Sequence, residues 1–533
     1  MIYKHLCLFV LILLSACTPE TASTIRENEL NSNRIIYGLT VDVSGIDPQV
    51  NQSSEMGIVL RSVYDTLVYR HPETLEFVPG LASSWEISED ELIYTFHLRN
   101  DVKFHDGEVF NAQAVAANLD RILDPETQSQ LSKFKLGPFA SYNVIDDFTI
   151  QIILAEPYAP LLDSFSQIYL AMASPKALAE YNTLTYQYHQ VGTGPFIFVE
   201  YLPGDRIVIR RNPDYAWGPD FYEAVTPESV NEIEFRFFTD PATRAIALES
   251  GDVQIMGELL PVDARALNNN SSIQVVPSEI PGQPSQFYFN TLRPHISNLA
   301  VRQALIYAVN REAIINAVFQ GESPIAWGPL SRSTLYYNRA IVNLYQYNLS
   351  QSQGILSSLG YSDTDSDGVL DLDGEPFELR IIVPPWGMTP DIVSLLQDQW
   401  KSLGVKTALV PVSGFVALIE QIKSGNWDLV AFNSFGLDPV FLNPGYMSDG
   451  SSHWTGYANT ELDNMLREAS RTIDPAIRYN LYGQAQIMIM DQALILPIRD
   501  YVNYNAYRLE LENLQFDPYG WYPLLHNLRF RQK

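Results

Sequence analysis

The spacing of apolar and polar positions predicts helices and strands in the first half of the chain. Apolar residues recur at helical spacing between Met56 and Leu67, which predicts an amphipathic helix. Residues 94–98 alternate with the period of a half-buried strand. Asn111 and Asn298 each precede a helical pattern with one apolar face, and an asparagine in that position can cap the helix. The first half is otherwise dominated by strand-like stretches.

The second half alternates more regularly between the two periods. Thr389 and Pro390 are a typical N-cap and first-turn pair for a helix that Gly404 ends. After this helix come a strand at 405–410, a helix at 415–423 and a strand at 428–432. Such a β-α-β-α-β order favours a mixed sheet with helices packed on its faces.

The N-terminus has the pattern of an export signal. Lys4 and His5 precede an apolar run that ends at Leu14, which is too short to span a bilayer and is typical of a secretory signal. Residues 14–17, Leu-Ser-Ala-Cys, resemble the lipobox of bacterial lipoproteins. This resemblance implies a signal peptide at 1–16 and a diacylated Cys17. The alternative is an ordinary signal peptide with an incidental cysteine.

Residues 17–33 are polar and lack periodicity, which is typical of a linker between a lipid anchor and a folded domain. No other segment is long and apolar enough to span a membrane. We therefore expect an extracytoplasmic protein that is attached to the cell membrane by lipid alone.

Composition narrows the possible partners. The chain has 533 residues and is 46% hydrophobic, enough for several cores. Its formal charge of -28 argues against binding nucleic acid or anionic lipid headgroups, since both need a basic surface. The only cysteines are Cys7 and Cys17, so the mature chain has no disulfide and its fold depends on core packing.

A series of short motifs, in order along nearly the whole mature chain, resembles the family 5 solute-binding proteins. This family includes the oligopeptide, dipeptide and nickel binders of ABC importers. The motifs are Val78–Glu86, Tyr94–Arg99, Val102–Glu108, Gly192–Phe196, Arg211–Tyr215, Ala247–Val253, Phe289–Thr291, Val301–Leu305 and Asn310–Glu312.

The resemblance implies an α/β fold of the periplasmic-binding-protein type, class II or cluster C, with the ligand buried between two lobes. Lobe I is expected to comprise residues 35–66, 190–289 and 500–533, with an inserted subdomain at 67–189. Lobe II is expected at 290–499. The lobes of this family close over the ligand by a hinge motion.

No motif indicates an enzyme. His105-Asp106-Gly107 is best interpreted as a turn after a strand, and Gly192-Thr193-Gly194 is followed by proline, which does not fit a dinucleotide-binding loop. The chain has no G-x-S-x-G, H-E-x-x-H or P-loop sequence, and its eight histidines show no paired metal-ligand spacing.

One acidic segment resembles a calcium loop. Asp363, Asp365, Asp367 and Asp371 occupy positions 1, 3, 5 and 9 of such a loop, with glycine at position 6. Position 12 is Gly374, where a calcium loop has a bidentate glutamate. Structural calcium and a plain acidic turn before a strand both remain open, and no other cofactor is expected.

The expected ligand-binding residues lie in lobe II. In peptide binders of the resembling family, the region of Asn433, Ser434, Phe435 and Asp438 supplies an aspartate that pairs with the ligand's free α-amine. Asp438 is the only acid in this segment, and a turn formed by Asp438 and Pro439 is the alternative. A peptide pocket also needs large, rigid apolar walls, for which loop residues Trp386 and Trp454 are candidates.

The resemblance predicts a monomeric receptor that captures short peptides and delivers them to the transmembrane subunits of an ABC permease. A binder of a nickel chelate or another small solute is an alternative, as is a signalling receptor without transport. Nickel-chelate binders tend to use histidine or arginine, and residues 433–457 contain only His453 and no arginine.

Overall fold

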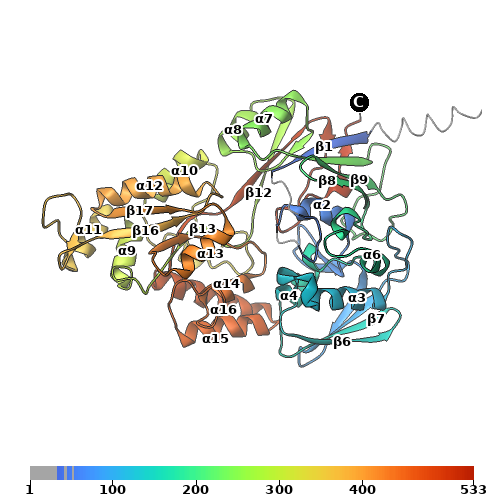
Figure 1. Ribbon diagram of the computed structural model, residues 1–533, viewed down its shortest axis with the longest axis horizontal. Helices are drawn as coiled ribbons and strands as arrows, with labels where there is room; N and C mark the ends of the chain where they lie inside the picture. Colours follow the sequence, from blue (N-terminus) through green and yellow to red (C-terminus); the bar gives the residue numbers. More distant parts are fainter. Residues whose placement is uncertain (1–32, 41–44, 51–52, 533) are drawn as a thin grey trace, which may run out of the picture.

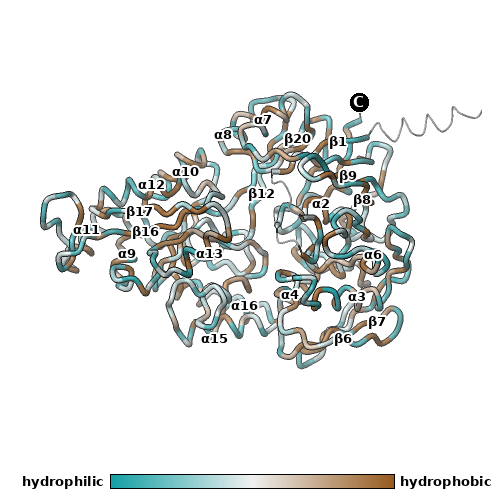
Figure 2. The backbone as a smooth tube through the Cα atoms, viewed as in Figure 1, coloured by the Kyte–Doolittle hydropathy of each residue, from teal (hydrophilic) through white to brown (hydrophobic). Residues whose placement is uncertain are grey.

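Three sheets organise the part of the fold that the structure describes. The computed structural model describes residues 33–40, 45–50 and 53–532. In Figure 1, the body built on a five-stranded sheet lies to the left, and the seven-stranded and four-stranded sheets lie in the body to the right. Each of these sheets has its own buried core, and hydrophobic positions are concentrated inside both bodies in Figure 2.

The seven-stranded sheet is the framework of lobe I, and its strands follow the order β12-β20-β11-β1-β10-β9-β8. Their bounds are Ile273–Glu279, Val502–Arg508, Ile255–Met256, Arg34–Leu39, Glu232–Phe237, Arg206–Arg211 and Phe196–Leu202, in that order. The helices of this lobe are α2 (Met56–Val63), α7 (Pro241–Ser250) and α8 (Pro261–Leu267). Helix α2 confirms the predicted amphipathic helix, although it ends at Val63 and not at Leu67.

The five-stranded sheet is the framework of lobe II, and its order is β17-β16-β18-β13-β19. The bounds are Lys406–Pro411, Glu378–Val383, Leu429–Ala431, Ser285–Phe289 and Ile495–Arg499, in that order. Strand β16 is parallel to β17 and β18, whereas β13 is antiparallel to β18 and β19. The predicted mixed sheet is therefore confirmed.

Lobe II also contains eight α-helices among the described residues. They are α9 (Leu299–Tyr307), α10 (Arg311–Phe319), α11 (Leu349–Ser358), α12 (Thr389–Ser402), α13 (Phe415–Lys423), α14 (Leu442–Tyr446), α15 (Thr460–Arg471) and α16 (Pro475–Asp491). Asn298 caps α9 as predicted, because its side chain accepts from the backbone N–H of Ala300. The predicted N-cap of α12 is wrong. Thr389 is already helical, and its hydroxyl donates to the carbonyl of Trp386 at 2.7 Å.

The four-stranded antiparallel sheet is the framework of the subdomain, with the order β4-β5-β7-β6. The strands are Ala82–Ile87, Ile93–Leu98, Thr149–Leu154 and Phe139–Asp146, in that order. Its helices are α3 (Ala112–Leu123), α4 (Gln130–Lys135), α5 (Leu161–Phe165) and α6 (Pro175–Glu180). Asn111 caps α3 as predicted, accepting from the N–H of Ala114 at 3.0 Å.

Shorter elements complete the described chain. The paired strands are β2 (Val68–Arg70) with β3 (Phe77–Pro79), β14 (Asp371–Leu372) with β15 (Glu375–Pro376), and β21 (Leu511–Glu512) with β22 (Arg529–Phe530). The 3₁₀ helices are Pro125–Thr127, Ile168–Leu170, Tyr186–Tyr188, Arg339–Ile341, η6 at Pro439–Phe441, and Leu525–Asn527.

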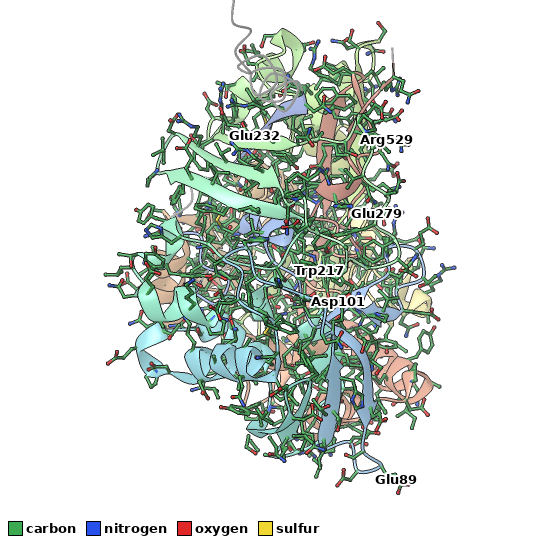
Figure 3. All side chains as sticks on the ribbon, turned by 90° about the vertical axis from the view of Figure 1, so that its right-hand side faces the viewer. Glu89, Asp101, Trp217, Glu232, Glu279 and Arg529 are labelled. Atoms are coloured by element: carbon green, nitrogen blue, oxygen red, sulfur yellow. The ribbon has the colours of Figure 1, made fainter. Side chains whose placement is uncertain are left out.

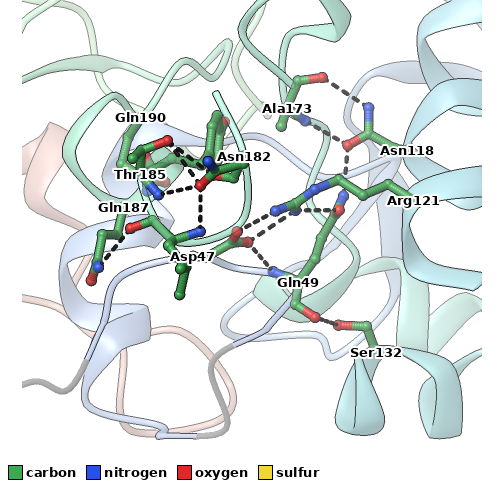
Figure 4. A network of polar contacts seen from close by, with 12 residues as sticks. Asp47, Gln49, Asn118, Arg121, Ser132, Ala173, Asn182, Thr185, Gln187 and Gln190 are labelled. Atoms are coloured by element: carbon green, nitrogen blue, oxygen red, sulfur yellow. Dashed lines mark hydrogen bonds and ion pairs between the residues drawn. The ribbon is translucent and has the colours of Figure 1, made fainter. Parts of the chain in front are cut away.

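A polar network joins lobe I to the subdomain (Figure 4). Arg121 of α3 pairs with Asp47 and donates to the side chain of Gln49 at 2.8 Å. The Gln49 amide donates to Asn118, and its carbonyl accepts from Ser132 of α4. Buried polar groups that satisfy one another in this way rigidify a junction.

Trp217 contributes to the same junction. In Figure 3, Glu89 of the subdomain and Glu232 of lobe I lie toward opposite ends of the molecule, with Trp217 in the interior between them. Trp217 packs in the hydrophobic core of the subdomain, and its indole N–H donates to the Asp65 carboxylate of lobe I at 3.0 Å.

The chain passes between the lobes twice, and these two crossings form the hinge. The first lies between β12 and β13, at residues 280–284, and the second lies between β19 and β20, at residues 500–501. Gly282 in the first crossing has a φ of +139°, and a Cβ there would lie 2.4 Å from the carbonyl oxygen of Ser434. Glycine is therefore required where the hinge passes directly against the segment 433–436.

The subdomain also contacts lobe II, on the side away from the hinge. The N–H of Ala159 donates to the carbonyl of Ser470 at 2.9 Å, and Arg471 pairs with Glu156. The two halves of the molecule therefore touch at the hinge and again where the subdomain meets lobe II.

Within the described ranges, no helix combines the length and apolar character needed to cross a bilayer.

Candidate ligand-binding site

A cavity of about 640 Å³ lies between the lobes, and we call it the main cavity. Lobe I contributes Glu55, Glu258 and Trp521 to its lining. Lobe II contributes Phe319, Trp386, Asn433 and Phe435, and Arg499 and Tyr501 line it beside the second hinge crossing. Cavities of about 300–1,000 Å³ are typical of small-molecule sites.

Aromatic rings from both lobes meet at one wall of the main cavity. Phe435 of lobe II packs edge-on against Tyr501, with ring centroids 5.2 Å apart, and against Trp521 of lobe I at 5.4 Å. Backbone hydrogen bonds fix the position of Phe435, because the N–H of Gly436 donates to Pro281 and that of Gln283 donates to Ser434. The hinge therefore positions this wall.

The lobe I wall carries two acids, Glu55 and Glu258, beside the buried Arg244, whose Nη1 donates to the Glu258 carbonyl at 2.7 Å. The Glu258 carboxylate accepts from the Thr40 hydroxyl at 2.7 Å, and its backbone N–H donates to Asn503 at 3.0 Å. Glu258 has a φ of +45°, an uncommon conformation for a residue other than glycine. Glu55 accepts from the N–H of Thr40 and lines the same wall.

Arg499, the last residue of β19, lines the main cavity beside the second hinge crossing. It is only 4% exposed, and its guanidinium lies over the rings of Phe319 and Tyr501, 3.9 and 4.6 Å from their centroids. Its Nη1 donates to the Ser323 hydroxyl at 3.1 Å. Burial lowers the pKa of Arg499, but a guanidinium stays charged in proteins.

A second, smaller cavity of about 160 Å³ lies between the subdomain and lobe II. It is lined by Phe134 and Lys135 of the subdomain and by Ser434 and Trp454 of lobe II. Phe435 lines both cavities. The predicted residues Asn433, Ser434, Phe435, Trp386 and Trp454 therefore all line the space between the lobes.

Asp438 lines neither of these two cavities. It is 4% exposed and forms an ion pair with Arg478 of α16, whose Nη1 lies 2.8 Å from Oδ2 and whose Nη2 donates to Oδ1 at 2.9 Å. Burial tends to lower the pKa of Arg478, but Asp438, Tyr482 and Tyr336 together outweigh burial and the pKa is raised. Asp438 also caps η6 by accepting from the N–H of Val440. The predicted anchoring of an amine by Asp438 stays a prediction.

The acidic loop brings three of its four predicted calcium ligands together. Carboxylate oxygens of Asp363, Asp365 and Asp371 lie within 4.8 Å of one another, whereas Asp367 is not part of this cluster. Loop N–H groups and the Thr364 hydroxyl donate to these carboxylates, and the Thr364 hydroxyl lowers the pKa of Asp371. Internal hydrogen bonds account for the loop as a turn, and calcium binding stays a prediction.

A family model for the bacterial extracellular solute-binding proteins, family 5 middle region, matches residues 76–456. The chain belongs to family 5 of the bacterial extracellular solute-binding proteins. The resemblance seen in the ordered motifs is thus confirmed. Members of this family are binding proteins and not enzymes.

Relatives and solved structures of the family match the chain over most of its length. The di/tripeptide-binding protein 1 of Pseudomonas aeruginosa is 26% identical, covering 92% of this chain and 93% of that protein. The heme-binding protein A of Haemophilus influenzae is 29% identical, covering 95% and 94%. NikA from Brucella suis, solved in complex with Fe(III)-EDTA, has a TM-score of 0.83 at 23% identity, covering 93% of this chain and all of that one. This likeness confirms the predicted two-lobed α/β fold.

Sequence reasoning missed several residues that line the main cavity of this family 5 protein. Arg499, Tyr501 and Trp521 come from the last part of the chain, and Glu258 comes from lobe I. No motif distinguishes them, because their role depends on the path of the hinge. Cys17 lies outside the described residues, so its predicted lipidation stays a prediction.

Proposed function

We propose that this family 5 protein captures short peptides in the main cavity and delivers them to the transmembrane subunits of an ABC permease. The observation that carries the proposal is an aromatic-lined cavity of about 640 Å³ between two lobes joined by a hinge. Large rings with polar groups between them suit ligands whose side chains vary. A relative named for di- and tripeptides supports the same ligand class.

A nickel chelate or another small solute is the second candidate, because a structural neighbour was solved with Fe(III)-EDTA. The described lining of the main cavity has no histidine but includes Arg244 and Arg499, so the preference for peptides rests on the aromatic walls and on the relative named for di- and tripeptides. We propose that the protein acts as a binding protein without catalysis of its own.

Native mass spectrometry of protein purified from its own host would test the proposal, because a co-purified ligand is weighed directly. We expect masses of short peptides. Truncating Phe435 or Trp386 to alanine should weaken peptide binding by roughly 30-fold or more, as for buried aromatic anchors at interfaces. Tyr479→Ala, at a ring that is 54% exposed on α16, is the matched control and should leave affinity unchanged. Calorimetry that detects no binding of di- or tripeptides to the wild type would contradict the peptide assignment.

We also propose that Cys17 is lipidated and attaches the protein to the membrane. Metabolic labelling with a palmitate analogue is expected to mark the wild type and not Cys17→Ser, because only the thiol can receive the diacylglyceryl group. Membrane fractionation should find the variant uncleaved or released. Equal labelling of both proteins would contradict the lipid anchor.

A further inference from the structure

The guanidinium of Arg499 differs from the other buried guanidinium groups of lobe II in how it is satisfied. Arg302 donates to the carbonyls of Ile296, Ser297, Gln492 and Ala493, and Arg311 donates to those of Ala326, Leu344 and Tyr345. Arg478 has the Asp438 carboxylate. Among the described residues, Arg499 donates only to Ser323, and its buried Nε has no partner.

No carboxylate of the described chain forms an ion pair with Arg499. The neighbouring Asp500 opposes the lowering of the Arg499 pKa by burial but lies beyond ion-pair distance of the guanidinium, and it accepts from the backbone N–H of Arg332 at 3.2 Å. Burial raises the pKa of Asp500 to about 7, although Arg499 and Arg332 oppose this shift. A buried charge without a counter-charge is costly unless something else compensates it. Arg499 also lines the main cavity, although only 4% of it is exposed.

The surroundings of Arg499 favour a planar anion. Phe319 and Tyr501 contact its guanidinium, and Ser323 holds Nη1, so the group has a defined orientation. A fixed guanidinium presents parallel N–H donors that match the two oxygens of a carboxylate. The position next to the second hinge crossing places this contact where the two lobes meet.

We propose that Arg499 binds a carboxylate of the ligand and so determines which solutes the cavity accepts. This inference rests on the proposed function, under which the group is the C-terminal carboxylate of a short peptide. The other end of the peptide then points toward lobe I, where Glu55 and Glu258 line the same cavity.

The test compares three variants with the wild type. Arg499→Met removes the charge but keeps an unbranched side chain against the two rings, and Arg499→Lys keeps a positive charge. Arg332→Met is the matched control, because this side chain is 51% exposed, pairs with Glu279 and does not line the cavity. The probes are tri-alanine, tri-leucine and tri-phenylalanine, each as free acid and as C-terminal amide, followed by citrate, glutamate and histidine.

Calorimetry should show that the wild type and the control bind a free acid about 30-fold to several thousand-fold more tightly than its amide, as for one lost partner of a buried charge pair. Arg499→Met should bind both forms equally weakly, and Arg499→Lys should regain part of the preference. The Tm of ligand-free Arg499→Met should be at least that of the wild type, because the uncompensated charge is gone. A structural role for Arg499 would lower it.

Equal binding of acid and amide by the wild type would overturn the inference, as would a preference retained by Arg499→Met. If no tripeptide binds, the peptide assignment fails separately. The inference then stands if citrate, glutamate or histidine raises the Tm of the wild type and not of Arg499→Met. It falls if none of them distinguishes the two proteins.

Discussion

Replacing Asp438 with asparagine is expected to lower the free energy of unfolding by about 3–5 kcal/mol, because it leaves the buried Arg478 guanidinium without its counter-charge. Urea or guanidinium unfolding monitored by circular dichroism measures the change. The matched control is Asp449→Asn, which breaks an exposed pair with Arg467 in the same lobe and should cost about 0–1 kcal/mol. Adding Arg478→Met to Asp438→Asn should recover stability, since the stranded charge is removed.

The same variant tests the hypothesis that Asp438 anchors the ligand's amine. An amine anchor predicts that N-acetylation weakens peptide binding to the wild type and that Asp438→Asn abolishes this difference with little change in stability. The ion pair with Arg478 predicts the reverse, a large loss of stability with the effect of acetylation retained. Unfolding and calorimetry on one set of samples therefore separate a structural role from a binding role.

The fold was predictable where local signals coincide with the final structure. Asparagine caps at Asn111 and Asn298 and the helix at 415–423 could be predicted because each depends on residues close in sequence. The start of α12 was off by one position, since the Thr389 hydroxyl donates to the Trp386 carbonyl and does not cap the helix. Helix ends are decided by such single contacts, which periodicity cannot resolve.

The ligand site was predictable only on the lobe II side. Asn433, Ser434 and Phe435 follow a buried strand, and family resemblance pointed to that segment. Arg499 gave no comparable signal, because an arginine at the end of an apolar strand reads as an ordinary surface or ion-paired residue. Arg499 is notable because no carboxylate of the described residues forms an ion pair with it, and only the three-dimensional structure reveals this. Asp438 illustrates the converse, since its partner Arg478 lies forty residues later in the chain.

His105 provides an expected pH dependence of stability. It lies in the turn that sequence analysis assigned to residues 105–107, where its Nε2 contacts the carbonyl oxygen of Gly194 at 2.9 Å and its Nδ1 has no partner among the described residues. Burial lowers the pKa of His105 to about 4, although the Gly194 carbonyl and Asp106 oppose this shift. The neutral ring, protonated on Nε2, is therefore the form that the folded protein accommodates.

The direction of the change in stability with pH follows from the pKa of His105 in the folded and the unfolded chain. An unfolded histidine has a pKa of about 6.5, so the unfolded chain binds a proton before the folded one as pH falls. The contribution of His105 to the free energy of unfolding is fully present above pH 6.5 and is lost between about pH 6.5 and pH 4. The loss amounts to about 3 kcal/mol, at about 1.36 kcal/mol per pKa unit. We expect His105→Gln, which can still donate to Gly194, to lack this loss.

Denaturant unfolding of both proteins between pH 4 and pH 8 measures the effect as a difference. Subtracting the stability of His105→Gln from that of the wild type at each pH cancels the contribution of other titrating groups. One of these is Asp500, whose pKa is raised to about 7 by burial. The stability advantage of the wild type over His105→Gln should shrink by about 3 kcal/mol as pH falls from 7 to 4. His526, whose pKa burial lowers to about 4, should give a change of the same sign in His526→Gln. The contrary result is a difference in free energy of unfolding between the two proteins that stays constant from pH 7 to pH 4. His105 would then be protonated in the folded protein as readily as in the unfolded chain, and the turn would have to accommodate an imidazolium.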